Sequence, residues 1–383
     1  KMWFAFWLRI HLRCFQIKLE TEMWLGRAAI LSVLSACVAA SQTEGCRDGE
    51  CEDDQLELLQ FKAPNGSSGS SGLKAKENVT SFGFNFNPSF GGIVPGHPLY
   101  KHLEGSSLPS LPKDIMPKDF DARSAWPHCT AVISHIRDQS KCGSCWAVGS
   151  ISTLNDRLCV LKGDNTTMLS ADDPLANCNS TIPGSPLPTC VHPIYGGCGG
   201  GQLEFVWKWY VESGAVNGAT YQHLGFGGEK IDTCAPYPFP PCHDLNWSDS
   251  EACKPDSFQT PPHFTKCPEK YEPHYWQDKI KATSWYKVPS NAIQAEIKTR
   301  GPVSCQVMAT CSMAHYTSGV YIPSGQVCGG HVMRIVGWGV ENGTDYWWVA
   351  NSWGKNWGDN GFIKWIRGID AAGIESGVVT GIL

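Results

Sequence analysis

The sequence lacks a strong charge of either sign. Its 31 Lys and Arg residues nearly balance 36 Asp and Glu residues, which gives a formal net charge of -5. Because no run of like charges or basic patch is present, we expect neither nucleic acid nor an anionic membrane as a partner. A long hydrophobic run is also missing, since the apolar stretch at residues 28–40 is too short to span a bilayer in the mature protein.

Cysteine, by contrast, is abundant. The 18 cysteines are spread along a chain too long for a small disulfide-knotted scaffold, which indicates an oxidising compartment and several disulfides. Asn-x-Ser/Thr sequons agree with that compartment, and we expect glycans at three of them, Asn165, Asn179 and Asn246. The other sequons begin at Asn65, Asn78 and Asn342.

The first 40 residues have the pattern of a targeting segment. Arg27 precedes the apolar run, which ends in small residues as a signal peptide does. Met23 would make a normal start, so residues 1–22 are interpreted as an upstream extension, with a signal anchor as the alternative. We therefore expect entry into the secretory pathway, followed by a lysosome-like acidic vesicle or secretion.

Composition divides the rest of the chain. Residues 63–72 form a Gly/Ser-rich flexible linker, and residues 73–112 are rich in Gly, Pro and Ser without a sustained period. From Pro117 onward the chain is dense in aromatics, cysteines and glycines. We therefore predict a separate leading segment at residues 41–115 and a folded domain at residues 116–383.

Hydrophobic periodicity changes along this domain. Apolar residues from Trp146 to Val160 recur at helical spacing, and further helices are predicted at residues 202–212 and 291–298. Strands separated by Gly/Asn turns are predicted later, at residues 332–340, 346–350 and 362–367. Helices followed by strands predict an α+β protein with two lobes, and a cleft between lobes is a natural place for a site.

Cys145 has the surroundings of a nucleophile. It ends Cys-Gly-Ser-Cys at residues 142–145 and directly precedes the first helical pattern. A thiol attacks as its thiolate, and a helix N-terminus stabilises that negative charge. The Cys145 backbone N–H and the Gln139 side-chain amide are placed to donate to an oxyanion. The alternative is a Cys142–Cys145 disulfide or metal pair, but neither a second ligand pair nor a βαβ redox pattern is visible.

His331 and Asn351 supply the base that a thiolate needs. Glycines precede His331, which allows close backbone approach, and an apolar strand follows it. Asn351 opens Asn-Ser-Trp further along, and an Asn can accept from the second histidine nitrogen and hold its tautomer. Trp353 in the same motif would keep water off that bond. These flanking residues oppose a merely structural histidine.

Together these motifs resemble the papain superfamily of cysteine peptidases over residues 117–383. The resemblance implies a helical lobe and a β-barrel-like lobe with the active-site cleft between them. It implies Cys145, His331 and Asn351 as the catalytic triad, with Gln139 in the oxyanion hole. Residues 41–115 would be the inhibitory prosegment of a zymogen whose catalytic domain is residues 116–383. No cofactor or metal is implied.

Within the superfamily the chain looks most like cathepsin B. Three stretches carry this likeness, at residues 120–123, 234–242 and 337–344, and a fainter one lies in the prosegment at residues 83–86. Residues 234–276 look like the insertion that cathepsin B folds as an occluding loop over the primed side of its cleft. Gly200 and Gly201 are expected to bind the extended substrate backbone.

The loop departs from cathepsin B, where two adjacent histidines hold the terminal carboxylate of the substrate. Cys242 and Cys253 fix the register, which places Asp244 and Leu245 at those two positions. His243 is shifted by one residue, so its side chain is expected to point elsewhere. Since Asp244 would repel a terminal carboxylate, we expect weak carboxydipeptidase activity and dominant endopeptidase activity.

The specificity pocket departs as well. Cathepsin B tolerates Arg as the second residue before the cut because a Glu lies at the pocket floor, whereas the matching run here ends in Gly377. A buried guanidinium without a partner is costly, so with Val332 after the histidine we expect an apolar preference. Trp353 completes the expected substrate-binding residues.

Family analogy also implies a set of disulfides that leaves Cys145 free. The expected pairs are Cys129–Cys159, Cys142–Cys198, Cys178–Cys190, Cys234–Cys267 and Cys242–Cys253. Cys305 and Cys311 would either bridge each other or stay as buried thiols. Cys328, shortly before His331, is either a lining residue of the primed side or a small buried hydrophobe.

Two other functions are weighed against a peptidase. A secreted, catalytically dead relative that binds matrix or a partner would typically lack the nucleophile, which is present here. Another acyl-transfer enzyme on the same triad is disfavoured by the extent of the resemblance. We therefore expect a monomeric endopeptidase that acts on proteins and peptides and is inhibited by its own prosegment and by cystatin-type inhibitors.

Overall fold

The computed structural model describes residues 116–178, 196–242, 253 and 258–383. The expected signal segment and prosegment lie outside the described residues, as do the expected site residues Asn179, Cys190, His243, Asp244 and Asn246. Within the described ranges, no helix combines the length and apolar character needed to cross a bilayer.

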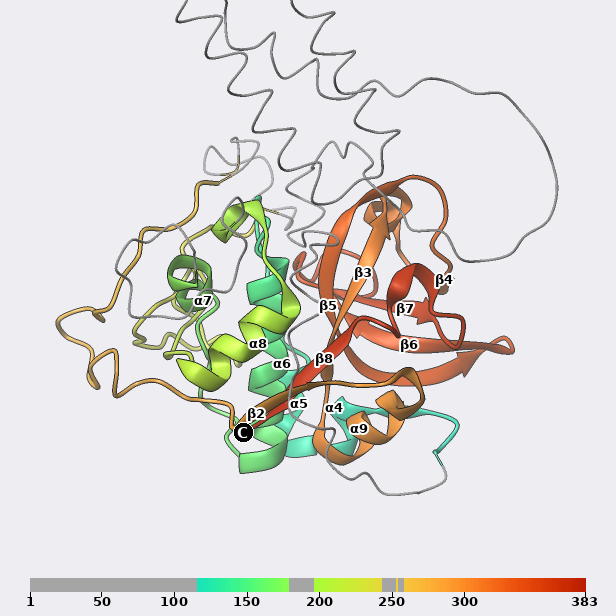
Figure 1. The fold of residues 1–383 in the computed structure, drawn as a ribbon, viewed down its shortest axis with the longest axis horizontal. Helices are drawn as coiled ribbons and strands as arrows, with labels where there is room; N and C mark the ends of the chain where they lie inside the picture. The colour runs from blue at the N-terminus through green and yellow to red at the C-terminus, as the bar shows by residue number, and fades with distance from the viewer. Residues whose placement is uncertain (1–115, 179–195, 243–252, 254–257) are drawn as a thin grey trace, which may run out of the picture. The chain divides into compact units, whose positions relative to one another are not determined.

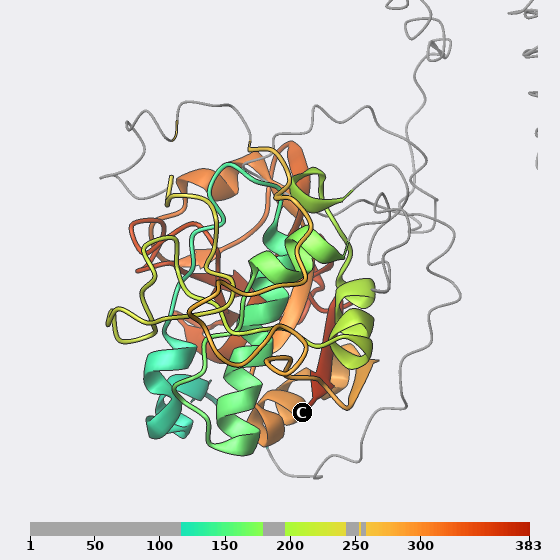
Figure 2. The ribbon, with the colours of Figure 1, turned by 90° about the vertical axis from the view of Figure 1, so that its left-hand side faces the viewer.

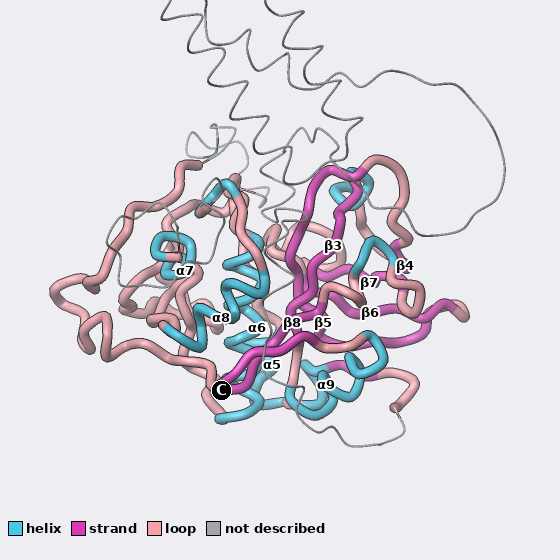
Figure 3. Tube along the Cα trace, viewed as in Figure 1, coloured by secondary structure: helices cyan, strands magenta, loops and turns pink. Residues whose placement is uncertain are grey.

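Helices and strands are segregated, as the sequence predicts (Figures 1 and 3). Helices α6 (Cys145–Lys162), α7 (Asp172–Asn177) and α8 (Leu203–Glu212) form the helical lobe, seen face-on in Figure 2. The helices predicted at residues 202–212 and 291–298 are confirmed as α8 and α9 (Ile293–Arg300). Shorter elements are α4 (Ala122–Ala125), α5 (Thr130–Ile133), η2 (Pro127–Cys129), η3 (Gly197–Gly199), η5 (Ser290–Ala292), η6 (Cys311–His315) and η7 (Ala371–Gly373).

Helix α6 is buried on all sides rather than along one stripe. Every residue from Cys145 to Cys159 is buried, and the helix contacts α8 in its own lobe and β5 in the other. The apolar stripe predicted from the sequence is therefore only part of its contact surface. The helix ends at Gly163, whose φ of 76° suits a glycine C-cap and whose N–H donates to the Cys159 carbonyl.

The second lobe is a sheet of eight strands, antiparallel except for the β4–β7 pair, in the order β2-β8-β3-β5-β6-β7-β4 with β1 paired to β5. The strands are β1 (Phe120–Asp121), β2 (Ser284–Lys287), β3 (Val303–Thr310), β4 (Val320–Tyr321), β5 (Val327–Glu341), β6 (Thr344–Ala350), β7 (Phe362–Ile366) and β8 (Val378–Ile382). Strands β5, β6 and β7 confirm the three predicted strands. The sequence did not predict β3, because most of its residues are buried on both faces and no clean alternation marks it.

Four of the expected disulfides are confirmed, and a fifth bridge corrects the analysis of the remaining cysteines. The confirmed pairs are Cys129–Cys159, Cys142–Cys198, Cys234–Cys267 and Cys242–Cys253. Cys311 bridges Cys328, while Cys305 stays a buried thiol. The cause is strand pairing: Thr310 at the end of β3 lies opposite Val327 at the start of β5. The expected alternatives of a Cys305–Cys311 bridge and of an unbridged Cys328 are therefore both wrong.

Candidate active site

A hairpin brings His331 and Asn351 together. Strands β5 and β6 are joined by Asn342 and Gly343, whose φ values of 50° and 80° are those of a type I′ turn. The pair of β5 and β6 residues farthest from the turn is Arg334 and Ala350. His331 precedes Arg334 and Asn351 follows Ala350, so the two side chains lie at the same end of the hairpin. The Asn351 Oδ1 lies 2.7 Å from the His331 Nε2.

This contact selects the tautomer of the neutral imidazole. Because the Asn351 Oδ1 can only accept, Nε2 carries the proton and Nδ1 is the basic nitrogen of the neutral ring. The Trp353 ring lies beside the imidazole, with ring centroids 5.0 Å apart. Both His331 and Trp353 are buried, so the His331–Asn351 hydrogen bond is shielded from water.

Cys145 is the first residue of α6 and therefore lies at the positive end of the helix dipole. The loop before it is held by the Cys142–Cys198 disulfide and by the Gly143 N–H, which donates to the Cys198 carbonyl at 3.0 Å. This bond links the loop before Cys145 to the glycine-rich segment that contains Gly200 and Gly201.

Those two glycines are required by the backbone. Gly200 has a φ of 112°, which side-chain-bearing residues rarely adopt, and a Cβ on Gly201 would lie 2.3 Å from the Trp146 ring. The Trp146 indole also donates to the Gly197 carbonyl at 3.1 Å. The segment is therefore packed closely against Trp146, the residue after Cys145 in α6.

The Gln139 side-chain amide is held in one orientation. Its Nε2 donates to the Cys142 carbonyl at 2.9 Å, and its Oε1 accepts from the Ser352 hydroxyl at 2.7 Å. The Gln139 backbone N–H also donates to the Ser352 carbonyl at 2.8 Å. A primary amide has a second N–H on Nε2, and this is the group that can meet an oxyanion.

Sequence reasoning missed two supporting residues, Ser352 and Tyr237. Ser352 lies between Asn351 and Trp353 in the Asn-Ser-Trp motif, and this position could have indicated that it lies close to the site. Tyr237 donates to the Gln139 carbonyl at 2.8 Å and shares a 2.7 Å hydrogen bond with the Ser144 hydroxyl. Nothing local marks Tyr237, because it reaches the site from a distant segment.

The residues expected at the specificity pocket lie at the junction of the lobes. A Cβ on Gly377 would lie 2.4 Å from the Gln306 Cγ, so a side chain at this position would collide with Gln306. Gln306 pairs with Val332 across β3 and β5, and Val332 packs against Gly149 of α6. The acid in the same run, Glu375, is buried and accepts from the Trp347 indole and from two backbone N–H groups.

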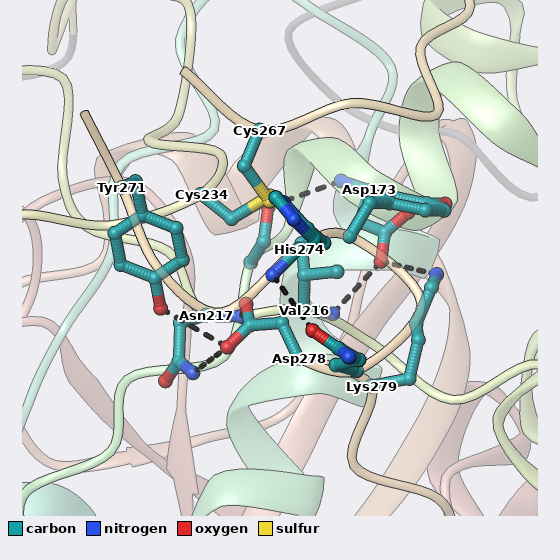
Figure 4. Close-up of a disulfide and its surroundings, with 12 residues drawn as sticks. Asp173, Val216, Asn217, Cys234, Cys267, Tyr271, His274, Asp278 and Lys279 are labelled. Atoms are coloured by element: carbon teal, nitrogen blue, oxygen red, sulfur yellow. Dashed lines mark hydrogen bonds and ion pairs between the residues drawn. A yellow bond between two sulfur atoms is a disulfide. The ribbon is translucent and has the colours of Figure 1, made fainter. Parts of the chain in front are cut away.

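The described part of the insertion is fastened to the helical lobe (Figure 4). The Cys234–Cys267 disulfide lies beside Asp278, which accepts from the Asn217 N–H at 2.7 Å and from the Tyr271 hydroxyl at 3.0 Å. Asp173 of α7 accepts from Lys279 at 2.6 Å and from the Val216 N–H at 2.8 Å. The disulfide and these hydrogen bonds therefore fasten the described part of residues 234–276 and the residues that follow it to the helical lobe.

Comparison with known proteins identifies the family. Residues 116–382 match the family model for papain family cysteine protease. Cathepsin B-like cysteine proteinase 6 of Caenorhabditis elegans is 38% identical over 289 residues, covering 73% of this chain and 71% of that protein. A cathepsin B-like cysteine proteinase of Schistosoma japonicum is 38% identical over 273 residues, covering 70% and 73%.

A solved structure shows the same relationship. Procathepsin B S9 from Trypanosoma congolense is 28% identical, with a TM-score of 0.60 and coverage of 77% of this chain and 87% of that one. The fold, the paired His331 and Asn351, and these matches lead to one conclusion. Together with the cathepsin B-like proteins named above, these observations show that the chain belongs to the papain family of cysteine peptidases.

Proposed function

We propose that the chain is a cysteine endopeptidase, made as a zymogen, in which Cys145 is the nucleophile and His331 the general base. The observation that carries this proposal is the 2.7 Å contact between His331 Nε2 and Asn351 Oδ1, which leaves Nδ1 as the basic ring nitrogen. The position of Cys145 at the start of α6 adds stabilisation of a thiolate.

In the proposed reaction His331 Nδ1 first takes the proton of the Cys145 thiol, and the resulting thiolate attacks the peptide carbonyl carbon. The negative charge moves to the carbonyl oxygen, where the Gln139 amide and the Cys145 backbone N–H stabilise it. His331 then gives its Nδ1 proton to the leaving amine as the C–N bond breaks, which leaves a thioester. Water, deprotonated by His331, attacks the thioester, and the thiolate leaves with release of the carboxylic acid.

Residues around Gly377 support a preference for an apolar second residue before the cut. The Glu375 carboxylate already accepts hydrogen bonds from three donors. Residue 377 is a glycine, and Gln306 lies too close to it for a side chain, so position 377 supplies no carboxylate either. An arginine would therefore be buried without a carboxylate partner. We expect a Leu-Arg or Phe-Arg reporter to be cleaved faster than an Arg-Arg reporter, and the reverse order would reject this preference.

Weak carboxydipeptidase activity is proposed from Asp244 and His243, which lie outside the described residues. The measurement compares release of dipeptides from matched peptides with free and amidated C-termini. Similar rates are expected. Much faster trimming of the free acid would show that a terminal carboxylate is bound after all.

The nucleophile itself is tested by covalent labelling. An epoxide inhibitor should modify the processed enzyme at Cys145, as located by peptide mass spectrometry, and Cys145→Ala should abolish both the label and the activity. Cys305→Ala is the matched control, because Cys305 is the other free cysteine among the described residues. Labelling that persists in Cys145→Ala would contradict the assignment.

The similarity to procathepsin B supports a prosegment and peptide substrates. We further propose inhibition by cystatin-type proteins, a monomeric enzyme, and delivery to an acidic vesicle or to the outside of the cell. Addition of a cystatin to the processed enzyme, with residual activity as the readout, tests the first of these.

A further inference from the structure

A pocket of about 280 Å³ lies next to the catalytic residues but contains none of them. Its lining includes Val148, one turn along α6 from Cys145, and Asp138 and Lys355, which flank the segments that carry Gln139 and Trp353. Aliphatic and aromatic side chains such as Leu224, Tyr237 and Phe239 supply most of the remaining wall. The volume is close to the lower end of the range for ligand pockets, about 300 Å³, so it suits a small organic molecule.

The pocket is lined by a buried arginine, Arg137. It lines the pocket, is only 8% exposed, and forms no ion pair with any side chain of the described residues. Its Nη2 donates to two neutral oxygens, the Asn155 Oδ1 at 3.0 Å and the Leu169 carbonyl at 2.9 Å. A buried guanidinium without a carboxylate is costly, so a counter-anion would stabilise it.

Nearby charges do not supply that anion. Burial and the charge of Arg334 lower the pKa of Arg137 to about 10, while Asp156, the nearby acid, is engaged by Arg334 in two 2.6 Å contacts. Lys355 adds a second cation to the lining and is exposed. The Asp138 carboxylate is the acid among the described lining residues, and its Oδ1 accepts from the Ser140 N–H at 2.7 Å.

We propose that this pocket binds a small organic monoanion, a carboxylate carried on an apolar group. Among the described lining residues the cations exceed the carboxylate by a single charge, which matches a carboxylate better than a phosphate dianion. The apolar walls account for the rest of the ligand. Such a carboxylate would come from a free acid or from the C-terminal residue of a peptide. The inference does not rest on peptidase activity, because neither Cys145 nor His331 lines the pocket.

The test measures binding to the full chain carrying Cys145→Ala, so that no turnover occurs. Phenylacetate and N-acetyl-leucine are titrated by calorimetry alongside their neutral amides, phenylacetamide and N-acetyl-leucinamide. Each acid should bind about tenfold more tightly than its amide, since a charge-assisted hydrogen bond is lost in the amide. Binding of N-acetyl-leucine alone would identify a peptide C-terminus as the source, and binding of both acids would show that a free acid suffices.

Variants locate the site. Lys355→Gln should weaken acid binding by about two- to fivefold, as expected for an exposed ion pair, whereas Lys162→Gln at the far end of α6 should not change it. Ala219→Leu, which fills the pocket without altering charge, should abolish binding. The proposal is overturned if neither acid binds, if amides bind as well as acids, or if Ala219→Leu binds like the parent while folded by its thermal transition.

Discussion

Asp172 and Asp173 are neighbours in α7 with opposite surroundings. Asp173 accepts hydrogen bonds from Lys279, Val216 and Tyr275, whereas the buried Oδ1 of Asp172 has no hydrogen-bond partner among the described residues. Burial, with a smaller contribution from the charge of Asp173, raises the pKa of Asp172 to about 8. In the unfolded chain an Asp titrates near pH 4, as in model peptides (about 3.9). Asp172 therefore destabilises the fold increasingly as the pH rises from about 4 to about 8.

Asp172→Asn should remove this effect. We expect the variant to be more stable than the parent at pH 7, by about 1–3 kcal/mol, and to match it at about pH 3, where both folded and unfolded Asp172 are largely protonated. Urea denaturation at both pH values measures the difference. Asp173→Asn is the control and should destabilise at pH 7. If Asp172→Asn raised the free energy of unfolding equally at both pH values, the ionisation of Asp172 would have no part in stability.

Ser352 holds the side chain of Gln139, the residue proposed for the oxyanion hole. Its hydroxyl holds the Gln139 Oε1 at 2.7 Å and so directs the amide nitrogen. Ser352→Ala should lower kcat by about tenfold with KM nearly unchanged, and Gln139→Ala should lower kcat by about 100- to 1000-fold. Steady-state kinetics on one reporter peptide gives both values. A change confined to KM would assign Ser352 to substrate binding instead.

At the scale of elements, the Cys311–Cys328 disulfide joins η6 to the start of β5, three residues before His331. The double variant Cys311→Ser/Cys328→Ser should lose about 3 kcal/mol of unfolding free energy, since the bridge closes a loop of 17 residues. Thermal unfolding without reductant measures the loss. Cys305→Ala, which removes a buried thiol on the neighbouring strand, should cost less. An equal loss in both would mean that cysteine packing, and not the bridge, stabilises this end of β5.

Across the described part as a whole, an ion pair joins the two lobes. Asp156 of α6 receives Arg334 of β5 through two 2.6 Å contacts, and both side chains are buried. Burial raises the pKa of Asp156, and the Arg334 guanidinium opposes that rise. Removal of the carboxylate would leave Arg334 buried without its acid.

Asp156→Asn should therefore destabilise the protein by about 3–5 kcal/mol, measured by urea denaturation near neutral pH. The matched control is Glu212→Gln, which breaks the exposed Lys208–Glu212 pair of α8 and should cost about 0–1 kcal/mol. Similar losses in the two variants would show that the pair between the lobes contributes no more than a surface contact.

The sequence by itself determined the family and much of the local structure. Cys145 before a helical pattern and the Asn-Gly turn between β5 and β6 are local signals, because helix starts and tight turns depend on adjacent residues. Only the tertiary structure decided which cysteine joins Cys328, how Ser352 and Tyr237 hold Gln139, and that Arg137 lines a pocket without a carboxylate partner. Each of these depends on segments far apart in the chain, whose register and packing no local pattern records.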